Sequence, residues 1–98
     1  MRSRQNGLKS TDDSQDEILA IRALGFLASD SDRFERFLSL SGMTAEAVRN
    51  AATSKQVLKG VLEHILADES LLLVFCSEIN APPEDIYPVA RRLDGGIE

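Results

Sequence analysis

The sequence predicts an all-α fold, a compact six-helix orthogonal bundle, and three observations support this prediction. Apolar residues recur at the i, i+3, i+4 spacing of a buried helix face, and no segment alternates with the period of two that a half-buried strand requires. Capping residues and glycines divide the chain into six such segments. The connections of two to four residues between them are too short for the crossovers of a parallel sheet.

A chain of 98 residues is long enough for one modest core but too short for two domains. We expect a single helical domain over residues 14–94. The polar residues 1–13 lack a helical period and are predicted to form a disordered N-terminal tail, and residues 95–98 are predicted to form a short C-terminal tail.

The first helix is expected over about residues 15–28, because Ser14 begins the spacing of a capping box. Ile21 and Phe26 widen its apolar stripe. The other members of that stripe are Leu19, Ala20, Ala23, Leu24, Leu27 and Ala28.

The second helix, about residues 31–41, is capped by Asp30 or the serine after it. It ends at Gly42, because glycine readily adopts the left-handed conformation found at helix ends. Thr44 caps a short third helix at about 45–52.

The fourth helix, about residues 55–67, begins after the capping residue Ser54. It has the cleanest amphipathic stripe in the chain: Val57, Leu58, Val61, Leu62, Ile65 and Leu66. Asp68 caps the fifth helix, about 69–79, and Asn80 suits its C-terminal end.

Pro83 suits the first turn of a sixth helix that extends to about residue 93. Pro88 is expected to kink this helix, because its ring removes an interior amide donor. Gly25 and Gly60 lie inside earlier helices, where glycine lowers stability relative to alanine. Both glycines are therefore predicted to permit a close helix crossing.

An internal repeat is suggested when the sequence is shifted by 38 residues. Residues 19–52 then align with 57–90 without a gap, and six of the 34 pairs are identical, against about two expected by chance. A duplication into two pseudo-symmetric three-helix halves would explain this, although any two three-helix units would also align on their caps and stripes. In either case Asp30 and Asp68 are explained as caps at equivalent positions.

The fifth helix differs most from its counterpart 38 residues earlier. Leu71, Leu73 and Val74 stand at positions where the second helix has three charged residues, so the fifth helix is apolar all round. Such a helix is either sandwiched at the centre of the bundle or presents a face to another chain. Leu71, Leu73 and Val74 are therefore the candidate interaction face.

The net charge of -5 is a property of the second half. Residues 19–52 are neutral overall, whereas 57–90 contain six acidic residues and only one basic residue, Lys59. An acidic surface repels phosphate backbones and anionic lipid, so we expect no membrane partner, and nucleic acid is disfavoured as a partner. The longest apolar run has six residues, whereas a membrane-spanning helix needs about 20. A protein partner is expected to bind the second half through an apolar centre with a basic rim.

His64 and Asp68 are the weak candidates for a polar site, because their spacing of four places them on one helix face. The chain has no other histidine to complete a metal or acid-base site, so we interpret His64 as a boundary residue beside a cap. Cys76 lies on an apolar stripe, which predicts a buried structural thiol. We assign no catalytic, cofactor-binding or metal-binding residue and expect no enzyme activity and no cofactor.

Two alternatives to a protein-interaction role stay open. The segment 37–52 has the outline of a helix-turn-helix DNA-binding motif that displays Arg49 and Asn50. However, the equivalent corner of the second half carries Glu84 and Asp85, which would repel DNA. The other alternative is a small ligand bound between the helices.

Three segments resemble a family of short bacterial proteins. They are GFLASD at residues 25–30, RFLSLSG at 36–42 and VLEHILADESLL at 61–72. The family is found mainly in alphaproteobacteria and is catalogued as domain of unknown function 3572. The resemblance covers about residues 17–93 and implies a stand-alone helical protein of the cytoplasm, and it transfers no active site.

A cytoplasmic location also agrees with the single cysteine, which cannot form an intrachain disulfide, and with the lack of an apolar signal-peptide stretch. We therefore expect a cytoplasmic, non-enzymatic protein-protein interaction or adaptor module. Its partner is expected to be an unknown protein, or a second copy bound through the second half.

Overall fold

The computed structural model describes residues 4–93, and its regular structure is entirely helical. In chain order the elements are α1 (Arg4–Ala28), α2 (Ser31–Ser41), α3 (Ala45–Asn50), α4 (Lys55–Leu66), α5 (Glu69–Ile79), a short 3-10 helix η1 (Pro83–Asp85) and α6 (Ile86–Leu93). No strand occurs within these residues, so the predicted all-α fold with six α-helices is confirmed. The predicted C-terminal tail at 95–98 lies outside the described residues.

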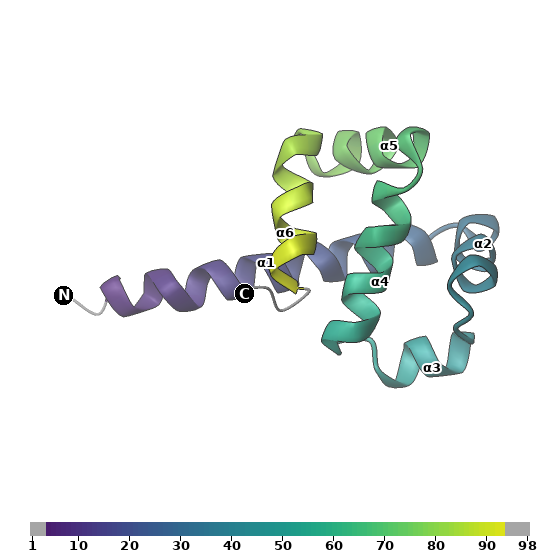
Figure 1. Cartoon of the computed structure of the whole chain (residues 1–98), viewed down its shortest axis with the longest axis horizontal. Coiled ribbons are helices and arrows are strands. Elements are labelled where there is room, and N and C mark those ends of the chain that lie inside the picture. Colours follow the sequence, from purple (N-terminus) through teal and green to yellow (C-terminus); the bar gives the residue numbers. More distant parts are fainter. Residues whose placement is uncertain (1–3, 94–98) are drawn as a thin grey trace.

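α4 is the central helix of the bundle. It packs against α1, α2, α5 and α6. Figure 1 shows α4 and α6 crossing α1, with α5 joining their ends on one side of α1. The described chain measures 47 × 28 × 25 Å, and its long dimension follows α1 (Figure 1).

α1 begins earlier than predicted. The expected start at about residue 15 was wrong, because the helix runs from Arg4 through Ser14 without interruption. The residues predicted as a disordered tail are therefore helical from Arg4 on. They contain no proline, and a helix already formed adds residues more easily than a new one nucleates. In Figure 1 the first turns of α1 extend beyond the rest of the bundle.

The helix ends carry the capping residues that the sequence predicted. Gly42 and Asn80 have positive φ angles of 78° and 61° and end α2 and α5 in the left-handed conformation, as predicted. Four side chains each accept a hydrogen bond from a backbone amide two or three residues later, at 3.0 to 3.2 Å. These caps are the predicted ones: Asp30, Thr44, Ser54 and Asp68.

The predicted sixth helix is divided in two. η1 occupies Pro83–Asp85, and α6 begins at Ile86. Pro88 therefore lies in the first turn of α6, where a backbone amide has no acceptor within the helix. The expected kink at an interior proline is replaced by a change from 3-10 to α geometry just before it.

The hydrophobic core is formed mainly where α4 meets its neighbours. The largest fully buried side chains are Leu27, Phe37, Leu58, Val61, Leu62, Ile65, Phe75 and Ile86. Two residues expected in the buried stripe of α1 lie outside it, because Ile21 is 42% exposed and Ala28 is also exposed. The apolar pattern of α1 therefore serves more than one face.

Gly25 and Gly60 differ in their surroundings. At Gly60 an added Cβ would lie 3.1 Å from Met43 Cε. Met43 lies in the loop between α2 and α3, so Gly60 is closely packed against a loop side chain and the predicted helix crossing is not shown there. At Gly25 nothing lies within 4 Å of an added Cβ. The prediction of a close helix crossing within this chain was therefore wrong for Gly25.

The two predicted halves are not packed alike. α6 packs against α1 and α4, whereas α3 has no comparably extensive contact with another helix. The shared features are the capping aspartates Asp30 and Asp68 before α2 and α5. An internal duplication stays a prediction.

Candidate interaction surface

α5 presents two apolar side chains to solvent. Leu73 is 52% exposed and Val74 is 43% exposed, while Leu71 is partly buried against the core. The opposite side of α5 is buried through Leu72 and Phe75, among others. α5 therefore lies at the edge of the bundle, and of the two predicted positions for this helix the central one was wrong.

The same positions on α2 show that the fold does not require apolar residues there. Leu73 and Val74 are the fifth and sixth residues after the N-cap of α5, and Glu35 and Arg36 are the fifth and sixth after the N-cap of α2. All four side chains are exposed. Burial within the described chain therefore does not explain why residues 73 and 74 are apolar.

Acidic residues lie on α5 and on the η1 segment that packs against it. Glu69 and Glu78 are exposed near its two ends. Glu84 and Asp85 lie on η1, which packs against α5. The sequence from residue 60 to 90 contains no lysine or arginine. We refer to the exposed Leu73 and Val74, with the exposed Ser70 and Ser77 beside them, as the α5 face.

Cys76 is a buried thiol on the inner side of α5, as predicted. Burial raises its pKa, and the nearby carboxylates of Asp85 and Glu84 raise it further. A thiol is nucleophilic or metal-binding only as the thiolate. The environment of Cys76 therefore suits a structural role.

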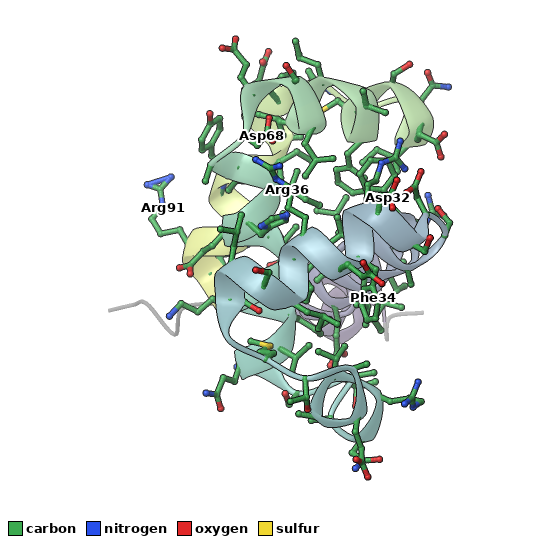
Figure 2. The ribbon with its side chains drawn as sticks, turned by 90° about the vertical axis from the view of Figure 1, so that its right-hand side faces the viewer. Asp32, Phe34, Arg36, Asp68 and Arg91 are labelled. Carbon is green, nitrogen blue, oxygen red and sulfur yellow. The ribbon has the colours of Figure 1, made fainter. Side chains whose placement is uncertain are left out.

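His64 is a partly buried residue at the boundary between α2 and α4. Its ring meets Phe37 edge-on, with centroids 5.3 Å apart, and its Nε2 atom is buried without a hydrogen-bond partner in the described chain. Burial lowers the pKa of His64; the carboxylate of Asp68 opposes this effect and the guanidinium of Arg36 adds to it. Figure 2 shows Arg36 projecting from α2 toward Asp68. These features favour a neutral imidazole near pH 7.

Asp68 does not form a polar site with His64. Its Oδ1 accepts a hydrogen bond from the amide of Leu71 at 3.2 Å, so Asp68 caps the N-terminus of α5. No hydrogen bond joins Asp68 to His64 in the described chain. The structure thus places the two weak candidates near each other without forming a catalytic pair.

A shallow hollow of about 380 Å³ lies beside His64, between the end of α2 and α4. Its lining residues are Leu40, Ser41, Met43, Gly60, Glu63, His64 and Ala67. An apolar group could rest in it, but the buried Nε2 of His64 would be reached only if a neighbouring side chain moved. Within residues 4–93 no group of three or more His, Cys, Asp or Glu side chains could hold a metal ion.

The described helices include none that is both long and apolar enough to cross a membrane.

A family model described as a protein of unknown function, DUF3572, matches residues 13–96. The chain belongs to this family. The DUF3572 match therefore agrees with the resemblance of its capping and stripe residues and extends it at both ends. No curated protein and no solved structure matches the chain.

Several surface features of this DUF3572 protein were not predicted from the sequence. Ile18 and Ile21 are 52% and 42% exposed on α1, although Ile21 was assigned to the buried stripe and Ile18 was assigned to neither face. The detectable sign was a second set of positions, 18, 21, 25 and 28, at alternating spacings of three and four. Arg33, one of the three charged residues of the second helix, has its guanidinium 4.4 Å from the ring centroid of Phe26.

Proposed function

We propose that this DUF3572 protein is a non-enzymatic protein-interaction module that binds its partner through the α5 face. One observation carries the proposal: Leu73 and Val74 are 52% and 43% exposed at positions where α2 carries charged residues. Adjacent exposed apolar side chains without a structural reason favour a contact with another molecule.

The charges around the α5 face favour a basic partner. Glu69, Glu78, Glu84 and Asp85 are exposed, and they have no lysine or arginine among their neighbours along the chain. A basic amphipathic helix would cover Leu73 and Val74 with its apolar side and place lysine or arginine opposite these carboxylates. Pairing of two identical α5 faces would instead bring the carboxylates together, so a copy of the same face is disfavoured.

Site-specific photo-crosslinking in the host cell tests this proposal. A photoreactive amino acid at position 73 is expected to give a discrete adduct with a second protein, because that side chain lies at the centre of the contact. The matched control carries the same amino acid at position 35, which is equally placed on α2 and is exposed. The adduct should disappear when Val74→Glu is added, and mass spectrometry should locate the link in a basic helix.

Three results would contradict the proposal: no adduct from position 73, the same adducts from positions 73 and 35, or an adduct that persists with Val74→Glu. Thermal unfolding of the Val74→Glu chain provides the folding control. Its midpoint should stay close to that of the parent, because the side chain is 43% exposed and is not part of the core.

A further inference from the structure

α1 has a second apolar face that no other helix among residues 4–93 covers. Ile18 and Ile21 are 52% and 42% exposed, and Gly25 and Ala28 are exposed along the same side. The buried residues Ala20, Ala23 and Leu27 point the other way, toward the bundle. In Figure 1 both α4 and α6 cross α1 on its near side. We refer to Ile18, Ile21, Gly25 and Ala28 as the α1 seam.

The spacing of the seam residues is that of a two-stranded helix pair. Intervals of three, four and three residues are the a and d positions of a heptad, which keep one narrow stripe facing a partner helix. The seam spans only about three turns. It is therefore suited to a helix-helix contact and too narrow to face a broad core.

Gly25 supports a close approach by another backbone. Glycine inside a helix lowers stability relative to alanine, and a close backbone approach is one reason for a glycine at such a position. The part of the chain that the structure describes supplies no such reason, because nothing in it lies within 4 Å of an added Cβ. A second helix lying across Gly25 would supply the missing reason.

The charges beside the seam indicate which helix would pack against it. Glu17 and Arg22 are exposed on opposite sides of it and are five residues apart. In a parallel two-stranded pair, the side chain preceding an a position meets the one five residues later on the partner helix. We propose that two copies of this chain associate through parallel α1 seams, with Glu17 of each copy opposite Arg22 of the other.

The alternative orientation is electrostatically unfavourable. Arg22 lies one residue from the midpoint of the seam, so an antiparallel pair would bring the two Arg22 side chains together. The two sides of the seam are its flanks. In the parallel pair, each flank places Glu17 of one copy opposite Arg22 of the other. Neither Glu17 nor Arg22 forms an ion pair within the described part of its own chain, so both are available for the contact. A contact of this size predicts a weak, concentration-dependent dimer.

Sedimentation of the full chain over a wide concentration range, at low and moderate salt, tests self-association. The parent should form a dimer that weakens as salt rises. Ile21→Glu should abolish the dimer, because it places a carboxylate in the seam. The matched control is Leu40→Glu, which changes an even more exposed leucine, 66% exposed on α2, and should leave the dimer unchanged.

Charge exchange tests the pairing itself. Glu17→Arg makes both flanks basic and Arg22→Glu makes both flanks acidic, so each change alone should weaken self-association by about tenfold. An equimolar mixture of the two variants should form a heterodimer, because each flank again joins opposite charges, and the double variant should recover parental affinity. Thermal unfolding of each variant confirms that it is folded before mixing.

The orientation is tested by Ala28→Cys in a Cys76→Ala background. Parallel seams place the two cysteines together and predict rapid oxidation to a disulfide dimer, whereas antiparallel seams would separate them. A parent that stays monomeric at every concentration and salt would overturn the proposal. So would a mixture no tighter than its components, a dimer lost with Leu73→Glu but kept with Ile21→Glu, or an Ala28→Cys chain that does not cross-link.

Discussion

Asp16 and Arg92 join the first helix of the bundle to the last. Arg92 Nε donates to Asp16 Oδ2 at 2.6 Å, and Arg92 Nη2 donates to Asp16 Oδ1 at 2.8 Å. Asp16 is only 6% exposed, whereas the Arg92 side chain remains 56% exposed. A two-point contact of this kind fixes both the separation and the relative orientation of α1 and α6.

Asp16→Asn should lower the free energy of unfolding by about 1–3 kcal/mol, because it removes the charge from a buried two-point hydrogen bond. Urea denaturation measures the effect. The control is Glu63→Gln, which removes the exposed Lys59–Glu63 ion pair, 3.8 Å long, and should cost at most about 0.5 kcal/mol. Equal losses in the two variants would mean that burial of Asp16 does not strengthen the contact.

The burial of His64 leads us to expect that the folded protein loses stability on mild acidification. Burial lowers its pKa below the ordinary value of 6.5. The unfolded imidazole therefore binds a proton at a higher pH than the folded one does. The stability contributed by the neutral imidazole is complete above pH 6.5 and is lost as the pH falls from 6.5 through the lower pKa of the folded state. Asp68 and Arg36 are the charged groups that act on His64, and they modify the size of the effect without reversing it.

The measurement is the difference in unfolding free energy between the parent and His64→Gln, followed from pH 7.5 to pH 5.5. Carboxylates titrate in both proteins, so the difference isolates His64. Stability of the parent should fall relative to the variant as pH decreases. A difference that stays constant across this range would show that His64 is protonated equally easily in the folded and unfolded chains.

Features set by a few neighbouring residues were predictable from the sequence. Asp30 and Asp68 cap their helices because a short carboxylate can reach an amide two or three residues later. Gly42 adopts a left-handed conformation that few other residues tolerate. These interactions are local, so their residue types and spacing are visible in the chain itself.

Features that depend on distant residues were not predictable in the same way. Asp16 and Arg92 are 76 residues apart, and only the packing of α1 against α6 brings them together. Leu72 and Leu73 are adjacent and chemically identical, yet one is 3% exposed and the other 52% exposed. In a helix that is apolar all round, hydrophobicity alone does not indicate which side is buried. The candidate residues Leu73 and Val74 could therefore be named, but not placed, from sequence.

Cys76 should react slowly with thiol reagents in the folded protein. Its side chain is buried, and its pKa is raised by burial and by Asp85 and Glu84, so both access and thiolate content are reduced. Reaction with a chromogenic disulfide at mildly alkaline pH measures the rate, with the urea-unfolded chain as the reference. Equal rates in the folded and unfolded chains would contradict this account, because they would require an exposed thiol.

The glycines of the helical region should respond differently to alanine. Gly25→Ala should raise the free energy of unfolding by about 0.5–1 kcal/mol, because it improves helix propensity and its Cβ meets nothing within 4 Å. Gly42→Ala should lower it by about 1–2 kcal/mol, because φ is +78° at the end of α2. Gly60→Ala should fall between them, because its Cβ would lie 3.1 Å from the mobile end of Met43. Urea denaturation of the three variants gives the ranking. A destabilised Gly25→Ala monomer would mean that α1 is more crowded at Gly25 than the structure shows.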